Sequence, residues 1–282
     1  MIQCREIRAD DIDAVVALLT YGFGRQAFWD RALARLQQRQ APPGLPQYGY
    51  VLDNDGRLVG VLLLICTDVP SNGASHFRCN MSSWYVMPAY RSYAALLAQR
   101  ATRHKNVTFF NVTPAPNTWP ILEAQGFRPF AIGRVLAVPW LNRSPFATRI
   151  EEIMPGTQAD RDLDQIEIDL LLHHKAYGCL SLICESDGQR HPFVFGLEQR
   201  RRYLHIANLI YCRNTAEFVR FAGPIGRFLA RRGYLFVEIQ SNGPIAGLIG
   251  RYSDGRPKYR KGGDQIHPGD VAYSERVVFG YW

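Results

Sequence analysis

The chain has 282 residues, of which 47% are apolar, and 33 Lys and Arg against 25 Asp and Glu give it a formal net charge of +8. This composition is typical of a soluble globular protein with one large or two ordinary domains. The longest apolar run, 59–66, is less than half of the roughly 20 residues that a membrane helix needs. The amino-terminal residues are charged, with no apolar stretch behind them, which excludes a secretory signal. We therefore expect a cytoplasmic protein without a membrane partner.

The cysteines show neither a C-x-x-C pair nor the clustered spacing of a zinc site. Most of them stand in apolar runs that are typical of strands. They are Cys4, Cys66, Cys79, Cys179, Cys184 and Cys212. We therefore predict free, buried thiols and no metal site.

The first half of the chain alternates between strand patterns and helix patterns. The strongest local signal is Asn54-Asp55-Gly56 between two apolar runs, which predicts a hairpin. Gly126 is expected to end a short helix in the left-handed conformation. The expected strands are 1–10, 48–54, 57–66, 77–87, 107–114 and 129–138, and the expected helices are 12–19, 28–38, 92–104 and 117–127. This order predicts a mixed α/β layer fold.

Part of the pattern returns after a linker at 139–149. The phrase G-x-L-x-L-I-C occurs at 60–66 and again at 178–184, and the second copy is followed by a helix pattern and a strand pattern. We predict two related domains, 1–140 and 150–282; a single irregular domain is the alternative. The stretch 251–275 is predicted to be a long, turn-rich loop.

One strand-turn-helix pattern contains candidate functional residues. Val86, Pro88 and Arg91 stand at the end of a strand and the start of a helix, and Asn117 and Gly126-Phe127 follow at the next strand and helix. In motif and element order, residues 3–140 resemble the GCN5-related N-acyltransferases (GNAT). The resemblance implies a GNAT-like acyl-CoA N-acyltransferase fold with a mixed sheet, in two tandem copies of which the second is divergent and free of cofactor.

The resemblance also implies acetyl-CoA, or another acyl-CoA, as the cofactor. Unpaired N–H groups at a helix start bind pyrophosphate. The implied cofactor-binding residues are Val86, Met87, Arg91, Ser92, Tyr93, Ala94 and Asn117. Ala94 and Leu96 stand where the family has glycine or another small residue, and Leu96 is expected to crowd the phosphates. The alternative is a strand and helix that only pack, with Arg91 paired to a carboxylate.

Acyl transfer to an amine needs an oxyanion donor, a proton acceptor and an acid. A backbone N–H near Val86 or Met87 suits the first role. The family's usual carboxylate is missing from 79–87, and Leu122 replaces the usual tyrosine. The substitute catalytic candidates are Ser83 (with Ser82), Tyr85 and Asn111, and each has a purely structural alternative. Glu123 is expected to be solvated, and Asp270 or Glu275 is a further candidate for the base.

The leading hypothesis is transfer of an acetyl or short acyl group from coenzyme A to an amine of a small molecule, amino sugar or peptide. The main alternative is a non-catalytic protein that senses acyl-CoA or binds a partner. Nucleic-acid binding is disfavoured because the arginine clusters 200–202 and 231–232 lie in the half with almost no net charge. A cysteine hydrolase is disfavoured because no cysteine follows a glycine-rich turn. A homodimer is compatible with the sequence.

Overall fold

A computed structural model describes residues 1–71, 74–144, 146–200, 204–263 and 266–280. The chain divides into two compact units. The first contains Met1–Pro129 together with Lys258–Gln265 and Tyr273–Gly280, and the second contains Phe130–Pro257 and Ile266–Ala272. The predicted boundary at 140–150 thus differs from the division by contacts, which also returns part of the carboxyl-terminal segment to the first unit.

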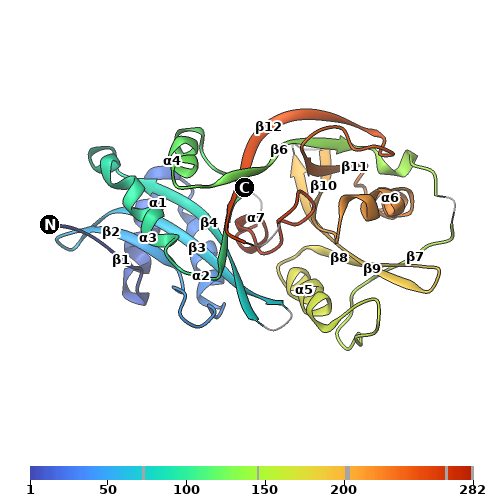
Figure 1. Ribbon diagram of the computed structural model, residues 1–282, viewed down its shortest axis with the longest axis horizontal. Helices are drawn as coiled ribbons and strands as arrows, with labels where there is room; N and C mark the ends of the chain where they lie inside the picture. Colours follow the sequence, from blue (N-terminus) through green and yellow to red (C-terminus); the bar gives the residue numbers. More distant parts are fainter. Residues whose placement is uncertain (72–73, 145, 201–203, 264–265, 281–282) are drawn as a thin grey trace. The chain divides into compact units, whose positions relative to one another are not determined.

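The first unit is a sheet with helices packed against it (Figure 1). Its own strands follow the sheet order β1-β2-β3-β4-β5, antiparallel except for the parallel pair β4 and β5. They are β1 (Ile2–Glu6), β2 (Gly49–Asn54), β3 (Arg57–Ser71), β4 (Ala74–Val86) and β5 (Val107–Asn111). The helices are α1 (Ile12–Phe23), α2 (Gln26–Gln37), α3 (Ala94–Ala101) and α4 (Trp119–Ala124). The predicted hairpin and the left-handed Gly126 are confirmed.

Strand alternation sorts the side chains of this sheet onto two faces. Leu62, Leu64 and Met81 share one core cluster with Leu97 of α3 and Leu122 of α4. The intervening residues of β3 and β4 therefore point to the opposite face. Helix α1 packs on β3 and β4, and α2 packs on α1. Both faces of the sheet are thus covered, as a mixed α/β fold requires.

The second unit repeats this strand order with one helix fewer before its hairpins. The sheet order is β7-β8-β9-β10-β11, antiparallel except for the parallel pair β10 and β11. The strands are β7 (Arg149–Glu152), β8 (Leu180–Ser186), β9 (Gln189–Arg200), β10 (Leu204–Tyr211) and β11 (Phe236–Ser241), and the helices are α5 (Gln165–Ala176) and α6 (Thr215–Ala230). The repeated pairing pattern supports two copies of one fold.

A strand distant in the sequence pairs with β5 in the first unit and with β11 in the second. The end of β12 (Gly250–Lys261) pairs antiparallel with β5, and β6 (Arg128–Ala137) pairs antiparallel with β11. Much of the predicted loop 251–275 is therefore a strand, and that prediction was wrong. Most of β12 before Lys258 is exposed and lacks apolar alternation, so its sequence carries little strand signal. It is the ladder to β5 that identifies this end of β12 as a strand.

The expectation from the repeated phrase also needs correction. The first G-x-L-x-L-I-C phrase lies in β3, whereas the second lies in β8, the counterpart of β2. The phrase therefore does not mark equivalent strands. Helix α6 runs through Pro224 without ending there. Helix α6 is packed closely against the turn η4 (Pro139–Leu141), because a Cβ on Gly226 would collide with the backbone of Trp140.

The prediction of six free thiols was wrong at two positions. Cys66 and Cys79 form a disulfide, and their Cα atoms are directly opposite each other on β3 and β4, 4.0 Å apart. The other four cysteines are free. The pairing follows from the β3–β4 hairpin, which brings positions equally distant from its turn together. None of the helices within the described ranges is long and apolar enough to cross a membrane.

Candidate functional site

The candidate site of the first unit begins where β4 and β5 separate. Their parallel register runs from Phe77 and Val107 to Asn80 and Phe110, and there it ends although β4 continues to Val86. Ser83 has φ +53°, and the pairing of β4 with β3 shifts at this point, as in a β-bulge. The last part of β4 therefore has one edge on β3 and the other free of β5.

The turn after β4 is wound as a short 3-10 helix, η2 (Pro88–Tyr93), that leads directly into α3. Some of its N–H groups are used internally, since Tyr90 donates to Met87 at 2.8 Å. Helix α3 then starts without a side-chain cap and without an acidic residue in its first turn. At this junction the Ala94 N–H donates to Arg91 O and is therefore used internally, but no cap or acidic side chain opposes the positive end of the helical segment.

The predicted phosphate-binding side chains lie at the surface of this turn. Arg91, Ser92 and Tyr93 are exposed, and within the described residues Arg91 has no ion pair with a carboxylate. The alternative in which Arg91 is paired internally therefore has no support. Leu96 is 39% exposed on α3, so its side chain does not fill a packed core position. Arg91 is thus accessible to a phosphate group, and the expected crowding by Leu96 stays a prediction.

The equivalent turn of the second unit is less favourable to anions. The Asn214 side chain accepts a hydrogen bond from the Glu217 N–H at 2.8 Å and so caps α6. Glu217 also places a carboxylate in the first turn, where it contacts His191 Nδ1 at 2.5 Å. A capped and acidic helix start opposes phosphate binding. Of the two helix starts, only that of α3 suits an anionic cofactor.

The backbone amides near the end of β4 point to alternate edges. Met87 N–H donates to Val59 O at 2.9 Å, so this amide is not free for an oxyanion, contrary to one of the two expectations. The N–H of Val86 faces the other edge, the one that β5 has left. Val86 is therefore the remaining backbone candidate for an oxyanion donor.

The three predicted catalytic side chains have different surroundings. Ser83 Oγ lies 3.0 Å from Ser82 Oγ. Tyr85 packs edge-on against Tyr21 and Phe23 of α1. Burial raises the pKa of Tyr85, Tyr21 adds a smaller increase, and the positive charge of Arg91 lowers it. Asn111 Oδ1 accepts from the Thr113 N–H at 3.1 Å, a local turn that closes β5. Ser83 and Tyr85 thus belong to the bulged part of β4, whereas Asn111 is engaged in a turn.

The positions after β5 give one more correction. Asn117, in the 3-10 turn η3 (Pro116–Thr118), is exposed. Leu122 is fully buried, in keeping with the missing tyrosine. Glu123 is not simply solvated, because Tyr259 Oη donates to its Oε1 at 2.6 Å. Burial and Glu123 together raise the pKa of Tyr259 to about 12.

A polar cluster that the sequence analysis largely missed lies at the point where β4 and β5 separate. Glu275 begins the short helix α7 (Glu275–Val278), and its N–H donates to Asn80 Oδ1 at 2.7 Å. Asn80 Nδ2 in turn donates to Phe110 O at 3.1 Å. Thr113 Oγ1 donates to Glu275 Oε1 at 2.5 Å, and Lys258 Nζ donates to Val112 O at 3.1 Å. Of this cluster, the sequence analysis named only Glu275, as a candidate base, and the polar Asn80 in an apolar strand was a further signal.

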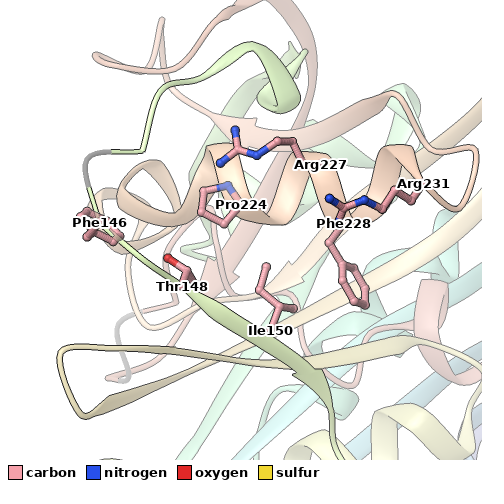
Figure 2. Close-up of a pocket in the computed structure, with 7 residues that line it drawn as sticks. All are labelled: Phe146, Thr148, Ile150, Pro224, Arg227, Phe228 and Arg231. Atoms are coloured by element: carbon pink, nitrogen blue, oxygen red, sulfur yellow. The ribbon is translucent and has the colours of Figure 1, made fainter.

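A cavity of about 270 Å³ lies in the second unit, along the carboxyl-terminal half of α6 (Figure 2). It is lined by Phe146, Thr148, Ile150, Pro224, Arg227, Phe228 and Arg231. It is therefore separate from the start of α6, where a GNAT-type cofactor would be expected. Across the described parts of the chain, no group of three His, Cys, Asp or Glu side chains is placed to hold a metal ion.

Comparison with known proteins agrees with this arrangement. No known family model matches the chain, and no curated protein matches it in sequence. Among solved structures, a GCN5-related N-acetyltransferase from Anabaena variabilis has a TM-score of 0.60 at 12% identity, covering 92% of this chain and 72% of that one. A GCN5-related N-acetyltransferase from Kribbella flavida has a TM-score of 0.54 at 12% identity, covering 92% and 70%.

A tandem GNAT protein from the clavulanic acid biosynthesis pathway has a TM-score of 0.51 at 12% identity, covering 94% of this chain and 100% of that one. The chain therefore has the GNAT fold. Because its strand order is repeated and the likeness extends over a whole tandem protein, the arrangement is that of two GNAT copies.

Proposed function

We propose that the first unit binds an acyl-coenzyme A, such as acetyl-CoA, at the β4–η2–α3 turn and transfers its acyl group to an amine of a small molecule, amino sugar or peptide. The observation that carries this proposal is the difference between the two helix starts. That of α3 is uncapped and not acidic, whereas that of α6 is capped by Asn214 and carries Glu217. Only the first offers a helix amino terminus to phosphates.

When bound, coenzyme A supplies the acyl group as an activated thioester. Arg91 contributes a guanidinium that is exposed beside the start of α3, suited to phosphate oxygens. The Val86 N–H, on the open edge of β4, is suited to the negative charge that develops on the thioester oxygen. Tyr85, which precedes Val86 on β4 and packs against Tyr21 and Phe23 of α1, offers a phenol at this end of the strand. The chain thus offers groups for binding and for charge stabilisation.

The second candidate function is a non-catalytic acyl-CoA sensor. The buried Leu122 favours it, because this position has no hydroxyl to protonate a departing thiolate. Under this alternative the binding residues keep their roles and the amine acceptor is absent. The two functions therefore differ in turnover and agree in cofactor binding.

Isothermal titration with acetyl-CoA, and with free coenzyme A as the control ligand, tests the binding step. Saturable binding is expected; no binding at millimolar ligand would refute both functions. The turnover assay follows thiol release in the presence of glucosamine, spermidine and a lysine-containing peptide. Acceleration by one of these amines supports the enzyme, whereas binding without acceleration supports the sensor.

A further inference from the structure

One carboxyl group in the first unit is buried without being fully hydrogen-bonded. Glu275 is only 2% exposed, and its Oε2 has no partner within the described part of the chain. The hydroxyl of the preceding Ser274 is also buried and without a partner among the described residues. Buried polar atoms are nearly always paired, so two adjacent unpaired ones mark a place built for water or a ligand group.

This carboxyl lies beside the open end of the β4–β5 pair. Its backbone N–H is bonded to Asn80, the last β4 residue in register with β5. Its Oε1 is bonded to Thr113, which is itself exposed. The buried carboxyl of Glu275 is therefore separated from solvent by the side chain of Thr113.

A polar path leads from this position along β4. Ser82 is two residues after Asn80 and so shares its face, about 7 Å further along the strand. Ser82 is buried, and its Oγ lies 3.0 Å from that of Ser83 at the bulge. The two serine hydroxyls thus extend from the face that carries Glu275 to the end of β4 that β5 has left.

We propose that Glu275 Oε2 is the proton acceptor of the acyl transfer, reached through the Ser83 and Ser82 hydroxyls; this rests on the proposed function. The neutral amine nitrogen forms a bond to the thioester carbonyl carbon, and the carbon–sulfur bond breaks with its electron pair on sulfur. The proton leaves the nitrogen through the serine pair to Glu275. The thiolate takes a proton from solvent, and Glu275 releases its proton to solvent, which restores the carboxylate. The products are the amide and the free thiol of coenzyme A.

The charges around Glu275 suit an acceptor that changes its protonation near neutrality. Burial is the largest effect and raises the pKa of Glu275 to about 7, against the Thr113 hydrogen bond and the positive charges of Arg276 and Lys258. Other charged or titratable groups on the neighbouring segments include His76 and Arg78 on the Asn80 face of β4, Arg35 on α2 and Arg39 just after α2. Nearly all of them are cationic, so they favour the ionised form that accepts a proton.

The test compares the wild type with Glu275→Gln and with Glu6→Gln, an exposed glutamate in the same unit that serves as the matched control. Glu275→Gln is expected to bind acetyl-CoA within twofold of the wild type and to lose about 10²-fold or more in kcat with the active amine. Its pH–rate profile should lose the limb near pH 7, and Glu275→Asp should recover part of the rate. Glu6→Gln should behave as the wild type.

A second readout needs neither cofactor nor turnover. Infrared spectra of the wild type should show a protonated-carboxyl band that titrates near pH 7, and this band should be absent from Glu275→Gln and present in Glu6→Gln. A wild type that turns over while Glu275→Gln keeps its rate and pH profile would overturn the role of Glu275. A wild type that turns over none of the amines would overturn the acyl transfer itself, and this role with it.

Discussion

At the scale of single residues, the proposed site depends on two charged side chains, one exposed and one buried. Arg91 lies on the surface at the start of α3 without a carboxylate partner in the described residues, so its charge is available to a ligand. Glu275 is buried close to the surface with one oxygen unpaired. These two residues are therefore the most informative positions to change.

Arg91→Glu is expected to weaken acetyl-CoA binding about tenfold or more, because it replaces an attraction to phosphate with a repulsion worth at least about 1.4 kcal/mol. Isothermal titration at low and high salt checks this. Arg57→Glu, at another exposed arginine of the same unit, is the matched control and should bind as the wild type does. Equal affinity of the Arg91 and Arg57 variants would remove Arg91 from the site.

The raised pKa of Glu275 also leads to a prediction of how the free energy of unfolding depends on pH. Its pKa is about 7 in the folded protein and 4.5 in the reference state, so the folded state binds more protons between these values. The free energy of unfolding should therefore fall as pH rises from about 4.5 to 7, by about 3 kcal/mol from this group. Urea unfolding of Glu275→Gln should lack this component, and that of Glu6→Gln should retain it. Parallel pH curves for the wild type and Glu275→Gln would contradict the raised pKa.

At the scale of elements, the β3–β4 hairpin supports the site strand. It is held by a long antiparallel ladder and by the Cys66–Cys79 disulfide between directly opposite positions. The bridge lies one residue before Asn80, where β4 leaves β5. It therefore fixes β4 at the point where the site begins.

The disulfide predicts a thiol count and a stability change. In urea without reductant, four thiols per chain should react, and all six should react after reduction. Reduction should lower the free energy of unfolding by about 3 kcal/mol, the value expected for a loop of this length. Six reactive thiols without reductant would contradict the bridge. Since disulfides are rare in the cytosol, the same count on protein taken from cells also tests the predicted cytoplasmic location.

At the scale of the whole molecule, one fold occurs twice with different helix starts. The strand order and pairing directions of β1–β5 recur in β7–β11. The second copy has one helix where the first has α1 and α2, and it caps α6 with Asn214. The two copies thus share the strand order and differ in the groups at the strand-to-helix turn.

This difference predicts the binding stoichiometry. Titration with acetyl-CoA should give about one site per chain, because Glu217 and the Asn214 cap oppose phosphate at α6. Asn214→Ala should lower the free energy of unfolding by about 1 kcal/mol without adding a site. A stoichiometry of about two would mean that the second copy also binds the cofactor.

The sequence by itself determined the local structure and the GNAT-like order of elements. The turn at Asn54-Asp55-Gly56, the cap at Gly126 and the strand-turn-helix through Arg91 are written in neighbouring residues, because turn and cap preferences act over a few positions. It also singled out Ser83 and Tyr85 on the bulged strand. Their catalytic roles, and the binding roles of the turn, stay predictions.

Only the tertiary structure decided which distant groups meet. Cys66 pairs with Cys79 across a hairpin, the end of β12 becomes a strand beside β5, and Glu275 reaches Asn80 across 195 residues of chain. None of these pairings leaves a periodic or local pattern, because each depends on how sheets close and which segments return to them. The same is true of the raised pKa of Glu275, which follows from burial among residues that are distant in the sequence.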